Sequence, residues 1–70
     1  MKNRIEFYRQ KAGESQIELG AAVGAVQASI SMYETGVHTP YIVMAQRIAA
    51  HYGVTMEEMF PTEDANGIEV

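Results

Sequence analysis

The sequence predicts an all-α fold, a compact domain of five short helices. Apolar residues recur three or four positions apart along most of the chain, as on the buried face of a helix. At three of the predicted helix starts a residue that can cap a helix stands three positions before a glutamate, and glycine follows each of four periodic segments. Seventy residues are enough for one domain.

The first two helices are each predicted by a capping box, in which a small polar side chain and a glutamate three residues later bond to each other's backbone. We expect the first helix to end at Gly13. The second helix is expected over 16–23, where Leu19 and Val23 share one face, and it ends at Gly24. The two capping pairs are Asn3 with Glu6 and Ser15 with Glu18.

A third helix is expected over 26–34, after a very short turn at Gly24. Ile30 is spaced to face the core, and Gly36 is a typical left-handed C-cap. Two short helices joined by a tight glycine turn are typical of a helix-turn-helix, whose second helix enters the major groove of DNA. The stretch 16–36 therefore predicts this motif.

The fourth helix is expected to start at Thr39 and Pro40, because threonine caps helices and proline favours the first helical position. It should end at Tyr52. A third capping box, Thr55 with Glu58, predicts a short fifth helix through about Phe60. The expected organisation is a domain over 1–61 and a flexible acidic tail over 62–70.

Composition excludes several classes of function. The absence of cysteine excludes disulfides, thiol catalysis and cysteine-based metal sites. His38 and His51 lie on different predicted elements without a carboxylate at ligand spacing, so no metal or cofactor is expected. No local motif supports a catalytic nucleophile, so we expect no enzyme. No apolar stretch approaches the ~20 residues that span a bilayer, which predicts a cytoplasmic protein without a membrane partner.

The net charge of −4 at neutral pH argues against a nucleic-acid partner, but the charge is unevenly distributed. Five of the nine acidic residues lie within 57–69. The first 54 residues contain five basic and four acidic residues. The acidic end of the chain therefore need not face DNA.

Several residues are informative through their spacing relative to one another rather than singly. They are Ser15-Gln16, Glu18-Leu19, Gly24, Gln27, Ile30-Ser31, Tyr33-Glu34, Gly36, Pro40, Ile48-Ala49, Gly53-Val54 and Glu57-Glu58-Met59-Phe60. Together they resemble the Cro and phage-repressor helix-turn-helix family, the XRE-like group, over roughly residues 3–60. The resemblance implies a lambda-repressor-like fold and a sequence-specific transcriptional regulator. It also implies binding to double-stranded DNA as a homodimer on a palindromic operator.

The resemblance assigns roles to particular positions. Bases are expected to be contacted by Gln27, Ala28, Ser31 and Met32. Phosphates are expected to be contacted by Gln16, Thr35, Val37 and His38. A glutamine can bond to adenine N6 and N7 together, and a short apolar side chain can touch a thymine methyl. Arg9 and Glu34 match positions that form an internal, structural ion pair.

Some positions depart from the family pattern. Val26 stands where a capping residue is usual, Met32 where a polar residue is common, and Val37 with His38 where a basic pair is usual. Glu14 takes a normally apolar position, and Gly20 takes one that is usually alanine. These departures keep a second hypothesis open, in which the fold serves as a protein-interaction module or antitoxin with weak or no DNA binding.

The fourth helix contains more apolar residues than one buried face needs. The expected core stripe is Ile42, Ala45, Ile48, Ala49 and Tyr52. The remaining apolar residues of this region are candidates for a dimer surface: Tyr41, Val43, Met44, Val54 and Met56.

Overall fold

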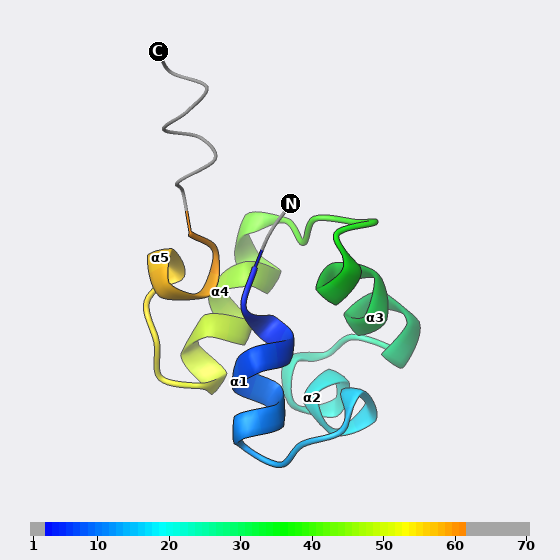
Figure 1. The fold of residues 1–70 in the computed structure, drawn as a ribbon. Coiled ribbons are helices and arrows are strands. Elements are labelled where there is room, and N and C mark those ends of the chain that lie inside the picture. The colour runs from blue at the N-terminus through cyan, green and yellow to red at the C-terminus, as the bar shows by residue number, and fades with distance from the viewer. Residues whose placement is uncertain (1–2, 62–70) are drawn as a thin grey trace.

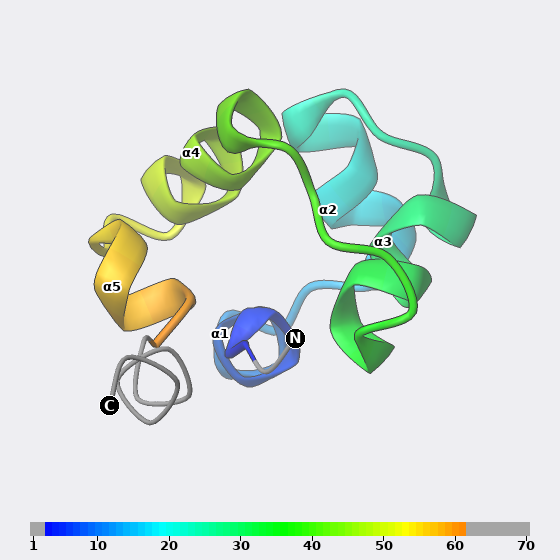
Figure 2. The ribbon, with the colours of Figure 1, turned by 90° about the horizontal axis from the view of Figure 1, so that it is seen from above.

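The computed structural model describes residues 3–61, in which five α-helices and no strand occur (Figure 1). The helices are α1 (Ile5–Lys11), α2 (Gln16–Val23), α3 (Gln27–Thr35), α4 (Ile42–His51) and α5 (Met56–Met59). Helix α2 packs against both α3 and α4, α5 packs against α4, and α1 packs against α3 (Figures 1 and 2). The all-α, five-helix prediction is confirmed. Within this part of the chain, no helix is long and apolar enough to cross a membrane.

Two of the three predicted capping boxes are present, at Ser15 and at Thr55. Around Ser15, the Glu18 amide donates to the serine hydroxyl at 3.0 Å, and the Ser15 amide donates to the glutamate at 2.8 Å. The box predicted at Asn3 is wrong. Asn3 accepts from the Ile5 amide at 3.1 Å but turns its Nδ2 to the carbonyl of Tyr33, 2.8 Å away. Its side chain therefore joins the start of α1 to α3, a long-range contact that local spacing does not reveal.

The start of the fourth helix is a second correction. The N-cap of α4 is Tyr41 and no side chain caps it, so the helix does not begin at Thr39 and Pro40. Pro40 is buried in the preceding loop. Burial of this apolar ring favours an extended approach to the helix over a threonine cap, which contributes only about 1 kcal/mol.

The inward face of α4 also differs from the prediction. Met44, Ala45, Ile48 and Ala49 are buried, whereas Ile42 is 62% exposed. At 3.6 residues per turn, Met44 and Ile48 lie on one face, and this face turns Ile42 outward. Ile42 is thus wrongly placed in the core stripe. Met44, at 4% exposure, is wrongly placed among the candidate dimer residues.

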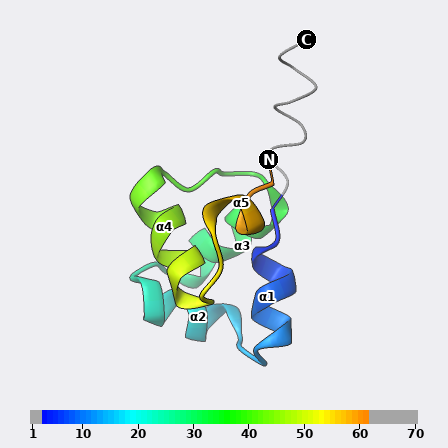
Figure 3. The same ribbon diagram turned by 90° about the vertical axis from the view of Figure 1, so that its left-hand side faces the viewer.

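One apolar core joins all five helices. Its fully enclosed members are Ile5, Leu19, Ile30, Ile48 and Met59, one from each helix. A backbone hydrogen bond of 2.9 Å from the Arg4 amide to the Met59 carbonyl joins the start of α1 to the end of α5, on the face seen in Figure 3. Burying each such side chain contributes about 1.5–3 kcal/mol. Because α3 supplies only Ile30 to the fully buried set, its other side stays available at the surface.

Candidate nucleic-acid interface

The turn between α2 and α3 brings two backbone segments unusually close. Gly24 adopts a left-handed conformation with φ of 85°. The amides of Gly24 and Ala25 both donate to the carbonyl of Gly20, at 2.8 and 2.9 Å. A Cβ at Gly20 would lie 2.3 Å from the carbonyl oxygen of Ala25. The glycine at this departure from the family pattern therefore allows the close approach that sets α3 against α2.

The outer side of α3 presents the residues predicted to contact bases. Gln27 and Ala28 are exposed, and Ser31 and Met32 are partly exposed, while Ile30 points into the core. The N-cap, Val26, is 68% exposed and makes no side-chain cap hydrogen bond, as its apolar character predicts. A free helix with an accessible first turn can enter a major groove.

An internal ion pair supports this helix from behind. The Nε of Arg9 lies 2.6 Å from Glu34 Oε2, and a second guanidinium nitrogen donates to Oε1 at 3.3 Å. The side chains are only 12% and 4% exposed. The hydrogen bond to Glu34 raises the pKa of Arg9 above its ordinary value, against the opposing effect of burial. The structure thus contains the pair that the resemblance implied, and Arg9 is not free to contact phosphate.

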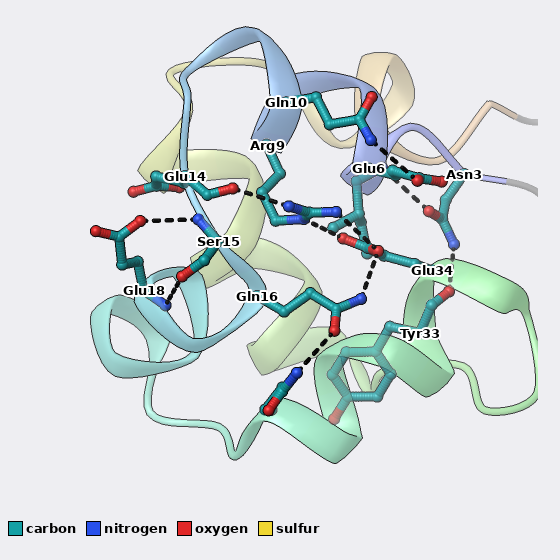
Figure 4. A network of polar contacts seen from close by, with 12 residues as sticks. Asn3, Glu6, Arg9, Gln10, Glu14, Ser15, Gln16, Glu18, Tyr33 and Glu34 are labelled. Atoms are coloured by element: carbon teal, nitrogen blue, oxygen red, sulfur yellow. Dashed lines mark hydrogen bonds and ion pairs between the residues drawn. The ribbon is translucent and has the colours of Figure 1, made fainter.

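The ion pair continues into two amide side chains. Gln16 donates from Nε2 to Glu34 Oε1 at 2.9 Å, and Figure 4 shows Arg9, Glu34 and Gln16 pointing toward one another. Gln27 donates from Nε2 to the Oε1 of Gln16 at 3.3 Å. We call these four residues the Arg9–Gln27 network. The sequence predicted a base contact for Gln27 and a phosphate contact for Gln16, but not the hydrogen bonds of either glutamine, because bonds across 11 and 18 positions have no local signal.

Of the four residues predicted to contact phosphate, Gln16 belongs to the Arg9–Gln27 network, and the other three follow Glu34 along the chain. Thr35, Val37 and His38 are exposed at and beyond the end of α3. The hydroxyl of Thr35 and the amide of His38 both donate to the Met32 carbonyl, at 3.3 and 3.2 Å, so this segment folds back onto the helix. The sequence from 12 to 46 contains neither lysine nor arginine. The interface therefore presents amides, hydroxyls and backbone amides in place of cationic side chains.

A second polar cluster, which the sequence analysis missed, joins the α1–α2 turn to the end of α4. Glu14 accepts from the Tyr52 hydroxyl at 2.7 Å and lies 2.8 Å from His51 Nε2. Burial raises the pKa of Glu14, but the hydrogen bonds from Tyr52 and His51 outweigh it, so the pKa lies below its ordinary value. Burial, followed by the bond to Glu14, raises the pKa of Tyr52. The acid at a normally apolar position is therefore satisfied by partners that a sequence pattern could not connect.

Neither histidine belongs to a metal site in the described part of the chain. Over residues 3–61, no three His, Cys, Asp or Glu side chains are grouped so as to hold a metal ion. His51 instead bonds to Glu14, and His38 lies in the exposed segment after α3.

Comparison with known proteins places these features in a wider group. Residues 5–59 match the family model described as helix-turn-helix. The chain is 32% identical over 66 residues to an uncharacterized HTH-type transcriptional regulator of Bacillus subtilis, YgzD, a match covering 94% of this chain and all of that protein. It is 33% identical over 64 residues to an HTH-type transcriptional regulator of Methanocaldococcus jannaschii, covering 91% and 97% of the two chains. A regulator of Archaeoglobus fulgidus is 33% identical over 64 residues, with 91% of each chain covered.

Proposed function

The chain belongs to the helix-turn-helix family of DNA-binding transcriptional regulators, and we propose that it represses transcription by binding a palindromic operator as a homodimer. The family consists of regulators rather than enzymes. In this proposal the protein acts in the cytoplasm. There it occupies a promoter and excludes RNA polymerase.

The observation that carries the proposal is the outer side of α3. It starts with an exposed glutamine and an exposed alanine, and that glutamine is hydrogen-bonded to a network that contains a partly buried ion pair. Gln27 offers a donor and an acceptor to a base edge, and Ala28 offers a methyl group to thymine. Ser31 and Met32 extend the same side of the helix by one turn. Gln16 retains one amide hydrogen for a phosphate beside the start of α2.

A second copy is proposed because one such helix contacts too few base pairs for useful selectivity. Two modules about 34 Å apart would contact both halves of a palindrome. The apolar residues at the start of α4 support this pairing. Tyr41 is 65% exposed, Ile42 62% and Val43 46%, and they are consecutive in the chain. Val54 and Met56, the other candidates for the dimer surface, are partly buried against the core. In our revised dimer surface the exposed Ile42 takes the place of the buried Met44.

The alternative function is a protein-interaction module, or an antitoxin, with the same fold. The absence of lysine and arginine from 12 to 46 favours it, because phosphate contacts usually require cations. The exposed Val26 and Val37, at 68% and 69%, also fit an apolar partner better than a phosphate backbone. In this case the protein would be recovered from its own cells with a stoichiometric protein partner and without DNA.

Selection from a random pool of duplex DNA tests the proposal, with sedimentation of the selected complex as a second measurement. We expect an inverted repeat with half-sites about one helical turn apart, and two protein chains per duplex. The affinity should fall less with salt than in domains with six to ten phosphate contacts, which lose about 10³–10⁵ between 50 and 200 mM salt. No enrichment of any sequence at low salt would contradict the proposal and favour the interaction module.

A further inference from the structure

We propose that Glu34 makes this protein prefer adenine to guanine at one operator position, although it lies behind the interface. This inference rests on the proposed function. The nearly buried carboxylate of Glu34 determines how the amide side chains of Gln16 and Gln27 are oriented. The role is positioning, because Glu34 itself is 4% exposed in its side chain.

The first step is the contact between Glu34 and Gln16. A carboxylate only accepts hydrogen bonds, whereas an amide donates from nitrogen and accepts at oxygen. Both oxygens of Glu34 accept from Arg9, and Oε1 also accepts from Gln16 Nε2 at 2.9 Å. Turning the amide of Gln16 over would set its oxygen against Glu34 Oε1 at hydrogen-bond distance. The nitrogen of Gln16 must therefore face inward and its oxygen outward.

The second step is that the outward oxygen of Gln16 fixes the orientation of the Gln27 amide, which we expect to contact a base. The outward oxygen of Gln16 accepts from Gln27 Nε2 at 3.3 Å. Gln27 then retains one amide hydrogen and its carbonyl oxygen for a ligand. Adenine presents an acceptor at N7 and a donor at N6, which match this pair, whereas guanine presents two acceptors at N7 and O6. Guanine would place its O6 against the oxygen of Gln27, so the network selects against it.

Removing the carboxylate of Glu34 should weaken the preference for adenine over guanine. Glu34→Gln replaces it with an amide of the same size, which can bond to Gln16 in either orientation. Gln16→Met removes the middle amide and leaves the Arg9–Glu34 pair in place, so it provides the test if Glu34→Gln does not fold. Glu6→Gln is the matched control, because it also converts a glutamate to an amide, and within residues 3–61 the side chain of Glu6 hydrogen-bonds only to Gln10 in the neighbouring turn.

The experiment first locates the base pair at which Gln27 acts, as the pair whose preference in a random duplex pool is lost in Gln27→Ala. Dissociation constants are then measured for two duplexes that carry A·T or G·C at that pair. We expect the wild type and Glu6→Gln to prefer A·T equally. Glu34→Gln and Gln16→Met should lower the A·T to G·C ratio by about 2- to 10-fold, the equivalent of one net hydrogen bond. Loss of stability alone would lower both affinities and leave the ratio unchanged.

Three results would overturn the inference. The first is an unchanged ratio in folded Gln16→Met, and the second is a wild-type preference for G·C at the Gln27-dependent pair. In both cases the proposed function would stand. The third is a wild type that enriches no DNA at all, in which case the proposed function fails and this inference fails with it.

Discussion

Replacing Gly20 with alanine sets two effects of known size against each other. Within a helix, alanine is favoured over glycine by about 0.5–1 kcal/mol. In this fold the added Cβ would lie 2.3 Å from the backbone oxygen of Ala25, more than 1 Å inside ordinary van der Waals contact. That oxygen belongs to the turn and cannot move as a side chain can. Overpacking of this kind costs about 1–3 kcal/mol. Displacing the turn also weakens the two hydrogen bonds to the Gly20 carbonyl, at about 1 kcal/mol each.

We therefore expect Gly20→Ala to destabilise the domain by about 1–3 kcal/mol, a large part of the 3–5 kcal/mol typical of a core this small. Urea unfolding followed by circular dichroism measures it, and the midpoint should fall by about 1–3 M for a slope of about 1 kcal/mol/M. Ala21→Gly, at the exposed neighbouring position, calibrates helix propensity alone. If Gly20→Ala raises stability by as much as Ala21→Gly lowers it, the argument from the close turn is refuted.

Three further predictions concern the cap, the loop and the polar cluster. Val26→Ser should stabilise the domain by about 1 kcal/mol in thermal unfolding, because α3 lacks a side-chain cap; no gain would mean that its first amides are already satisfied. Val37→Lys should strengthen binding to all duplexes alike. It should also make the slope of log K against log salt concentration more negative by about 0.9, and an unchanged slope would place the loop away from phosphate. The lowered pKa of Glu14 stabilises the fold above its ordinary value of 4.5, and this stability disappears as pH falls through the lowered pKa. The raised pKa of Tyr52 stabilises the fold below its ordinary value of 10.0, and this stability disappears as pH rises above it. Tyr52→Phe should therefore remove the alkaline loss and weaken the acid one in unfolding curves from pH 3 to 11; identical curves would exclude the cluster as their cause.

Local signals predicted the helix-turn-helix well. The capping box at Ser15 and the left-handed Gly24 place α2 at the predicted residues, and Gly36 caps α3 as expected. These signals act within one turn of helix, so the sequence contains them in full. The start of α4 was predicted wrongly because the local preference of Thr39 and Pro40 competes with burial of the proline, which depends on the whole fold.

The contacts behind the site were beyond local reasoning. Glu14 meets its partners across 37 and 38 positions, and Gln16 meets Glu34 across 18. The sequence did identify which residues of α3 are exposed. Ile30 fixes the inward direction, helical geometry places Ala28 and Met32 on the opposite side, and Gln27 is exposed in the first turn. The orientation of that amide depends on its long-range neighbours, so only the structure supplies it.

The central claim is that the outer side of α3 contacts bases through Gln27. The most direct test compares wild type, Gln27→Ala and Gln10→Ala for binding to the best duplex selected by the wild type and to a scrambled duplex. Gln10→Ala is the control, because it removes an exposed glutamine from α1. We predict that Gln27→Ala weakens binding to the selected duplex by about 1–3 kcal/mol, leaves binding to the scrambled duplex unchanged and relaxes the preference at one pair per half-site. Equal affinity and equal preference in wild type and Gln27→Ala would contradict the claim.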